Sequence, residues 1–328
     1  MTDKSISSEQ QPTASAFTLK TAAAALSIAL IAFTLAFLPT IRASLPKLIP
    51  QKATTNSIRA MSTTSPSLKI TKRPWSARGH ADHGWLYTFH TFSFASYYSP
   101  KFESYGPLRV INEDRVERGT GFGTHSHAEF LIWSYIVSGE LEHKDSMGNL
   151  EKLRRGEVQF TSAGTGIRHS EYNRNNEEDV HFLQIWAKPN VKGLKPSYVT
   201  RKFTDDMKKD KLVRVLESVD RHDGADTESS PIPANADVSQ DASILSPGKS
   251  VEHTVVGKGK RNVYLHVVMT GKKQPQTGGA QLKVGETVLG EGDGAFVDGS
   301  KGGDVINIES VGDKDAEFLL FDMGAEEV

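Results

Sequence analysis

Three histidines and one glutamate carry the first chemistry that this sequence suggests. His125 and His127 are two residues apart, and so are His169 and Glu171. Side chains alternate between the two faces of an extended strand, so the members of each pair point to the same side. If the two strands lie side by side, three imidazoles and one carboxylate converge on one point. Such a set suits a divalent transition metal, most naturally Fe(II), and leaves coordination positions open for other ligands.

The residues around these two pairs predict short β-strands joined by tight turns. Residues 130–143 are rich in β-favouring side chains and are interrupted by a glycine-containing turn. Residues 145–149 form a cluster of turn residues, and the glycine-rich residues 163–166 directly precede the second pair. Short strands with turn signals about every 8–12 residues indicate a β-sandwich or a β-barrel.

The spacing of glycines and histidines resembles the two-part cupin signature. Gly119 and His125 match its first part, and His169 and Asn173 match its second part. The resemblance implies a small β-barrel with a metal bound inside it, on the same histidines that the strand alternation brings together.

Two departures from the cupin signature are typical of its pirin branch. Leu131 and Ile132 occupy the places of the usual cupin glutamate, and four residues rather than two separate Gly164 from His169. The pirin glutamate lies two residues after the third histidine, where this chain has Glu171. The metal ligands that the resemblance implies are therefore the two pairs already identified.

The resemblance to pirins runs from about residue 70 to the C-terminus and is strongest over residues 78–203. It implies an all-β fold of two cupin-type β-barrels, a bicupin. It also implies a quercetin 2,3-dioxygenase type of activity, which opens a flavonol ring with dioxygen and releases carbon monoxide. Glu171 would then be both a metal ligand and the catalytic base that takes the proton of the 3-hydroxyl.

Alternatives remain for the metal and for the activity. We expect Fe(II), but the same ligands would hold manganese, nickel, cobalt or copper. Animal pirins, which this chain also resembles, are linked to iron-dependent regulation of transcription factors. The alternative is therefore a non-enzymatic regulatory protein whose metal alters a surface for a protein partner. A third possibility is a stress-related protein with an incidental quercetinase activity.

Composition excludes several kinds of site and partner. The 328 residues include 39 Lys and Arg, 40 Asp and Glu, and no cysteine, which gives a net charge of −1. This balance does not indicate direct nucleic acid binding, for which a basic face is expected. Without cysteine there are no disulfides or thiolate ligands, so any metal must be held by nitrogen and oxygen atoms.

The first 67 residues differ in composition from the rest of the chain. Residues 1–20 are polar and predict a disordered tail. Residues 21–41 carry no charge and are rich in Ala and Leu, so they predict a transmembrane helix of about the length that a bilayer requires. Residues 42–67, which are rich in Ser, Thr and Pro, predict a linker.

Positive charges after the apolar segment predict a single-pass membrane protein whose C-terminal domains are cytoplasmic. These charges are Arg42, Lys47, Lys52 and Arg59, with no acidic residue before Met61. Translation from Met61 would instead give a cytoplasmic or nuclear protein. If the N-terminus is a targeting segment, a mitochondrial location is expected.

The rest of the chain divides into two predicted domains. Residues 68–203 form the N-terminal barrel with the metal site, and residues 204–328 form a second cupin-like barrel without one. The second domain has three histidines, and none has another histidine or a glutamate two residues after it: His222, His253 and His266. We expect this domain to cover the hydrophobic face of the first.

The other histidines of the first domain are expected to pack or to bond with neighbours. His143 ends one predicted strand, and His181 lies on another. Three more stand among the aromatic residues of the domain's opening: His80, His83 and His90.

Aromatic residues near the ligand strands are candidates for a pocket that takes a planar substrate. The candidates are Phe122, Phe130, Trp133 and Phe160. Alternation gives Trp133 the parity of the first histidine pair if no bulge intervenes, whereas Phe130 lacks that parity.

Overall fold

The computed structural model describes residues 68–325, and the structural statements that follow concern this part of the chain. The predicted disordered tail (1–20), transmembrane helix (21–41) and linker (42–67) lie outside the described residues. The all-β prediction is confirmed within them. They contain 22 strands, one α-helix of four residues, α1 (Asp205–Lys208), and one short 3-10 turn.

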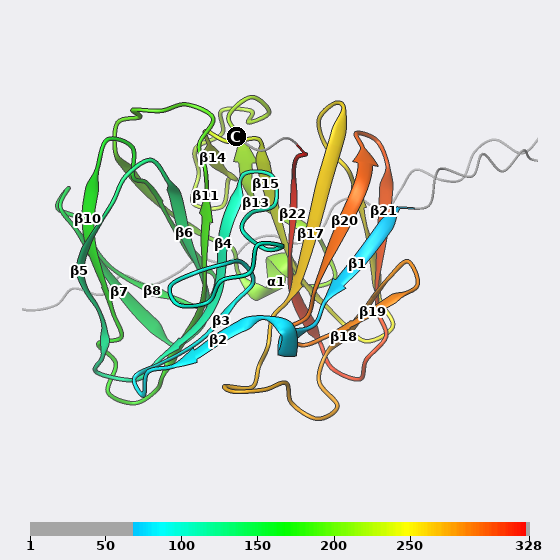
Figure 1. The fold of residues 1–328 in the computed structure, drawn as a ribbon, viewed down its shortest axis with the longest axis horizontal. Coiled ribbons are helices and arrows are strands. Elements are labelled where there is room, and N and C mark those ends of the chain that lie inside the picture. Colours follow the sequence, from blue (N-terminus) through cyan, green and yellow to red (C-terminus); the bar gives the residue numbers. More distant parts are fainter. Residues whose placement is uncertain (1–67, 326–328) are drawn as a thin grey trace, which may run out of the picture. The chain divides into compact units, whose positions relative to one another are not determined.

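The first half of the described chain packs a seven-stranded sheet against a four-stranded sheet (Figure 1). The seven-stranded sheet contains, in spatial order, β12 (Ser197–Lys202), β9 (Glu157–Ser162), β6 (Leu131–Ser138), β11 (Val180–Ala187), β4 (Leu108–Val116), β3 (Leu86–His90) and β2 (Gly79–Asp82). The four-stranded sheet contains β5 (Gly121–His127), β10 (Ile167–Tyr172), β7 (Glu140–Asp145) and β8 (Leu150–Arg154).

The second half repeats this arrangement of strands. Its seven-stranded sheet contains β1 (Lys69–Arg73), β20 (Gly294–Lys301), β17 (Lys260–Val267), β22 (Ala316–Gly324), β15 (Val238–Leu245), β13 (Val213–Ser218) and β14 (Ile232–Ala234). Its four-stranded sheet contains β16 (Ser250–Thr254), β21 (Val305–Ser310), β18 (Gln281–Val284) and β19 (Thr287–Gly290). Hydrogen bonding closes none of the four described sheets into a ring.

The first strand of the described chain belongs to the sheet of the second half. β1 pairs antiparallel with β20, with Lys69 opposite Asp298 (Figure 1). The predicted domain boundary at residues 203/204 assigns this strand to the first half in sequence. The strand pairing crosses that boundary, and the boundary itself stays a prediction.

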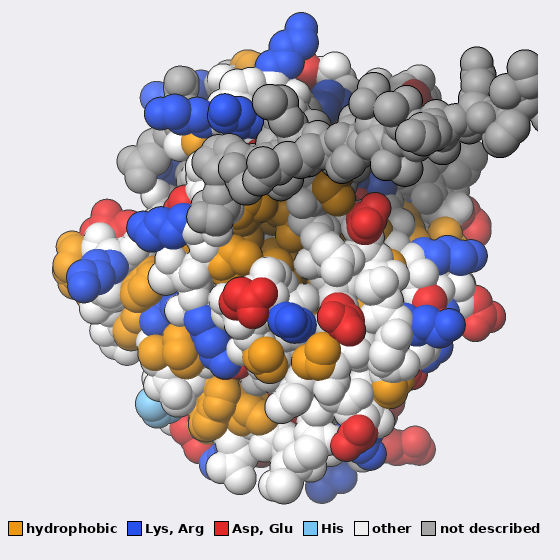
Figure 2. All heavy atoms as spheres, turned by 90° about the vertical axis from the view of Figure 1, so that its right-hand side faces the viewer, with side chains coloured by type: hydrophobic (Ala, Val, Ile, Leu, Met, Phe, Trp, Pro, Cys, Tyr) orange, Lys and Arg blue, Asp and Glu red, His pale blue; other side chains and the backbone are white. Residues whose placement is uncertain are grey.

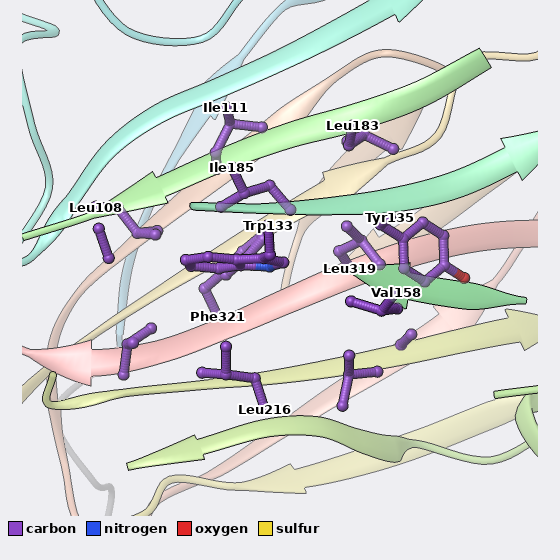
Figure 3. Packing of buried hydrophobic residues seen from close by; sticks show 14 of the residues in the cluster. Leu108, Ile111, Trp133, Tyr135, Val158, Leu183, Ile185, Leu216, Leu319 and Phe321 are labelled. Atoms are coloured by element: carbon purple, nitrogen blue, oxygen red, sulfur yellow. The ribbon is translucent and has the colours of Figure 1, made fainter. Parts of the chain in front are cut away.

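Alternation along the strands of the seven-stranded sheets gives each sheet two apolar faces. One face of each contributes to a shared core between the halves, in which Trp133 of β6 lies near Leu216 of β13 and Phe321 of β22 (Figure 3). The opposite faces pack on the four-stranded sheets and form a separate core in each half. Because the shared core is the largest cluster of buried apolar residues described, docking of the halves is part of folding.

A buried carboxylate also joins the two halves. Glu113 of β4 is fully buried and accepts hydrogen bonds from Arg78 (2.8 Å), His181 (3.2 Å), His266 of β17 (3.1 Å) and the Met269 backbone N–H (2.8 Å). Burial by itself would raise the pKa of this carboxyl. The nearby Arg115 guanidinium and the two histidine bonds outweigh burial and hold the pKa well below 4.5. Glu113 is therefore an anion that fixes both halves.

We expect Glu113→Gln to lower the free energy of unfolding by about 3–5 kcal/mol, because the buried guanidinium groups of Arg78 and Arg115 lose their counter-charge. Denaturant unfolding at neutral pH measures the change. Glu178→Gln, an isosteric change at an exposed site, is the matched control and should have almost no effect. Equal stability of the two variants would contradict the role given to Glu113.

A histidine of the second half lies in an ion-pair network. His253 of β16 is buried between two carboxylates, with Nδ1 3.3 Å from Asp241 and Nε2 2.8 Å from Asp322. Arg261 donates from Nε to the other oxygen of Asp322 at 3.0 Å. Burial alone would lower the pKa of His253, but the hydrogen bonds to Asp241 and Asp322 outweigh burial and raise the pKa above 6.5.

The raised pKa of His253 predicts pH-dependent stability. The folded state binds the proton more tightly than the unfolded state, so the stabilisation is fully present below about pH 6.5 and is lost as pH rises through the raised pKa. Denaturant unfolding of the unmodified protein and of His253→Gln should therefore differ more at pH 6 than at pH 9. A difference that is constant or grows with pH would show that His253 is not held as a cation.

The predicted single-pass membrane localisation is wrong for the described chain. Residues 68–325 contain no helix long and apolar enough to cross a bilayer, since their α-helix has four residues whereas a crossing takes about 20. The apolar segment behind that prediction lies at residues 21–41, outside the described residues.

On the face in Figure 2, acidic and basic side chains are interspersed, and no patch of a single sign dominates.

Candidate metal centre

The two predicted ligand pairs lie on neighbouring strands of one sheet. β5 and β10 run antiparallel, and His125 is directly opposite His169. The strands approach closely at Gly121, where an added Cβ would lie 2.4 Å from the Glu171 carbonyl oxygen, so glycine is required there. The register shifts by one residue between His169 and Glu171, as in a β-bulge.

The three predicted histidines form one compact group. The ring centroids of His125, His127 and His169 are 4.6–4.9 Å apart, and the Nε2 atoms of His125 and His169 are 3.1 Å apart. Each ring offers one nitrogen within 4.8 Å of the others. His125 Nδ1 is 2.8 Å from the Gly123 carbonyl oxygen, which can only accept, so Nδ1 carries the hydrogen and Nε2 presents a lone pair in the neutral ring.

The electrostatics of this group suit a cation. Burial, followed by repulsion from His169 and His125, lowers the pKa of His127 to about 4, although Glu171 opposes the shift. Burial also lowers the pKa of His169. Histidine must be neutral to bind a metal, so these shifts leave the rings ready as ligands near neutral pH. His127 Nε2 and His169 Nδ1 are buried without a hydrogen-bond partner, which fits a site for a bound ion.

Glu171 is buried and held by two polar side chains of the seven-stranded sheet. Gln184 Nε2 on β11 donates to one carboxylate oxygen at 3.2 Å, and Ser134 Oγ on β6 lies 3.3 Å from the other. Ser134 Oγ is also 2.6 Å from Gln184 Oε1, so the three side chains form one network. These contacts hold the Glu171 carboxylate between the two sheets of the first half. Hydrogen bonds of this kind orient the ligands in many metal sites.

Among the described residues, two overlapping groups of three side chains could hold a metal ion, and both lie in the first half. The first is His125, His127 and His169, and the second is His143, His169 and Glu171. The structure thus brings Glu171 together with His169 and His143. Convergence of all four predicted ligands on one ion stays a prediction, because Glu171 is not within 4.8 Å of every nitrogen of the first group.

Trp186 of β11, which the sequence reasoning missed, lies beside the histidine group. Its ring is 4.8 Å from that of His127, and Phe130 and Phe94 lie 5.4 and 5.7 Å from the tryptophan. Alternation along Val180–Ala187 places Trp186 on the same face of the strand as Gln184 and on the opposite face from His181. This pattern could have indicated that Trp186 faces the site.

Trp133 does not face the histidine group, because the alternation on which its shared parity depended is interrupted between the two strands. Trp133 packs in the shared core, and its Nε1 donates to Gln240 of the second half at 2.6 Å (Figure 3). Glu129, with φ +58°, separates β5 from β6 and breaks the alternation. Phe160 lies 6.1 Å from Trp133 in the same core, and Phe122 packs on Trp85 instead. Of the four aromatic candidates, Phe130 contacts the aromatic residue next to the site.

Two of the remaining histidines of the first half, His90 and His181, lie where hydrogen bonding explains them. His90 is buried and 2.8 Å from Asn112, and His181 bonds to Glu113. His80 and His83 are exposed. In contrast, His143 belongs to the second ligand-capable group, which its predicted role as a strand-end residue did not include.

Comparison with known proteins places the chain in a family. A protein-family model described as Pirin matches residues 72–187. A pirin-like protein of Caulobacter vibrioides is 34% identical over 253 residues, which cover 77% of this chain and 99% of that protein. The chain belongs to the pirin family.

One sequence and one crystal structure from Escherichia coli are similar to this pirin. A quercetin 2,3-dioxygenase of strain K12 is 55% identical over 126 residues, which cover 38% of this chain. The match spans only about half of that relative's length, 54%. The crystal structure of the bacterial pirin YhhW in complex with nickel(II) has a TM-score of 0.67 at 36% identity, and the match covers 79% of this chain and all of that one.

We expect Gln184→Leu to weaken Ni(II) binding by about 10–100-fold, because Glu171 loses the donor that orients it. Isothermal titration calorimetry measures the affinity. Gln281→Leu, at an exposed position of β18, is the matched control and should bind Ni(II) as the unmodified protein does. Unchanged affinity in Gln184→Leu would show that this hydrogen bond does not support a ligand.

Proposed function

We propose that this pirin is a metal-dependent dioxygenase of the quercetin 2,3-dioxygenase type, acting on flavonol-type aromatic substrates. The single observation that carries the proposal is the placement of Glu171, a buried carboxylate fixed by Gln184 and Ser134 beside a group of histidines. The Escherichia coli relative that bears the name of this activity supports the assignment.

The proposed metal ligands are His125, His127, His169 and Glu171. Their donor atoms are nitrogen and oxygen, and two of them, on His127 and His169, are buried without a hydrogen-bond partner, which fits a divalent transition metal. We propose Fe(II), while the nickel complex of the similar pirin supports a divalent ion more generally. When bound, the metal would supply Lewis acidity and, as iron, electron exchange with dioxygen.

Glu171 is the proposed catalytic base. The hydrogen bonds to its two oxygens come from neutral groups, the Gln184 amide and the Ser134 hydroxyl. The carboxylate can therefore accept the proton of a flavonol 3-hydroxyl that lies within hydrogen-bond reach. Gln184 and Ser134 would keep the carboxylate in place during this transfer.

The aromatic residues beside the histidines are the proposed substrate wall. Trp186, Phe130 and Phe94 form a contiguous set of rings next to His127. Flat aromatic molecules gain from stacking or edge contacts with such rings, which favours a planar substrate over a flexible one. This preference agrees with a flavonol as the substrate class.

We propose that the two halves are cupin-type barrels, of which only the first holds a metal. In the second half, β16 occupies the sheet position that β5 has in the first. Its His253 is held by Asp241 and Asp322 rather than grouped with other histidines. Ion pairs would thus replace the metal there.

Oxygen uptake with quercetin tests the proposal. Purified protein reconstituted with Fe(II) should consume dioxygen and release carbon monoxide, whereas metal-free protein should not. Glu171→Gln should lose at least about 100-fold in turnover, within the range of acid–base catalysis, while it still binds metal. Glu142→Gln is the matched control, because this carboxylate pairs with Arg174 near the surface of the neighbouring strand β7.

Two outcomes would contradict parts of the proposal. Unchanged turnover in Glu171→Gln would remove its role as base. Tight iron binding without oxygen uptake on any flavonol would favour the alternative of a regulatory protein whose metal alters a docking surface.

A further inference from the structure

His143 lies next to the proposed metal centre but outside the proposed ligand set. It stands on β7 directly opposite Glu171 of β10, and its side chain is fully buried. The ring of His143 is 5.3 Å from that of His169. Because the two strands are hydrogen-bonded neighbours, the position of His143 relative to Glu171 is fixed by the sheet.

One nitrogen of His143 is fixed by a carboxylate that is itself immobilised. His143 Nε2 is 3.3 Å from an oxygen of Asp145. Asp145 also accepts hydrogen bonds from the Met147 and Asn149 backbone N–H groups and from the Asn149 side chain, at 2.7–3.0 Å. A carboxylate that orients a histidine in this way is a common arrangement around metal-binding histidines.

The other nitrogen of His143 has no partner. Nδ1 is buried and makes no hydrogen bond. Since Asp145 takes the hydrogen of Nε2, Nδ1 presents a lone pair in the neutral ring. The ring cannot turn freely, because it stacks on Tyr198 with 4.8 Å between ring centroids. A buried acceptor without a donor is unfavourable unless something occupies the space in front of it.

We propose that His143, His169 and Glu171 form a second cation position that overlaps the first. One ring nitrogen of His143 lies within 4.8 Å of ligand atoms of His169 and Glu171, and all three residues are buried. The two positions share His169 and, in the proposed ligand set, Glu171, and two divalent ions so close would repel strongly. One ion therefore occupies one position at a time and can move between them while it stays near His169 and Glu171.

This inference rests on the proposed metal centre, and Zn(II) binding tests it without the need for enzyme activity. The first position is removed in the double variant His125→Gln/His127→Gln. We expect this variant to bind one Zn(II) more weakly than the unmodified protein in isothermal titration calorimetry. Adding His143→Gln should weaken the remaining binding by more than about tenfold. Adding His83→Gln instead, at an exposed histidine, should leave it unchanged.

A crystallographic measurement on the unmodified protein avoids any effect of the substitutions on folding. At saturating Zn(II), anomalous scattering should show, besides the main peak, a weaker peak about 2.1 Å from a nitrogen of His143. Absence of that peak would overturn the proposal.

The calorimetric outcomes separate this inference from the proposed function. A folded double variant that binds no Zn(II), or that binds it equally well without His143, would overturn the second position alone. Failure of the unmodified protein to bind any divalent metal would remove both the second position and the proposed dioxygenase.

Discussion

A buried negative charge on β4 sets the constraint on which the described fold depends. Glu113 must stay paired, because an isolated carboxylate in this apolar core would be strongly unfavourable. Its partners come from both halves, so satisfying it requires the two seven-stranded sheets to dock. Asn112 and Asp114, on either side of Glu113 in β4, point to the opposite face of the strand. Fixing Glu113 therefore also fixes which side chains of β4 face the other way. Docking and the position of β4 are therefore coupled.

The part of the site that could be predicted from sequence is the part that local geometry determines. Residues two apart on a strand lie on the same face. The spacing of His125/His127 and of His169/Glu171 therefore predicted, without knowledge of the fold, that the members of each pair point the same way. The antiparallel pairing of β5 with β10 then placed His125 opposite His169. The all-β class followed equally from short strands and frequent turns.

The part that could not be predicted depends on pairing between distant strands or on a single backbone angle. His143 joins the ligand-capable residues because β7 pairs with β10, a neighbour that spacing along the chain does not specify. Trp133 faces away because Glu129 adopts a positive φ between β5 and β6, and Trp186 takes the place beside the histidines from β11. Composition of the apolar segment at residues 21–41 likewise suggested a membrane location that the described chain does not support.

The edge strand β1 has a consequence for how the molecule is assembled. β1 is the first strand of the described chain to be synthesised. Its hydrogen-bonding partner β20 emerges from the ribosome only after almost all of the described chain has been synthesised. Such distant pairing carries a large loop-closure entropy and slows folding. A recombinant fragment beginning at residue 204 would lack this strand and expose the β20 edge, which invites intermolecular strand addition and aggregation.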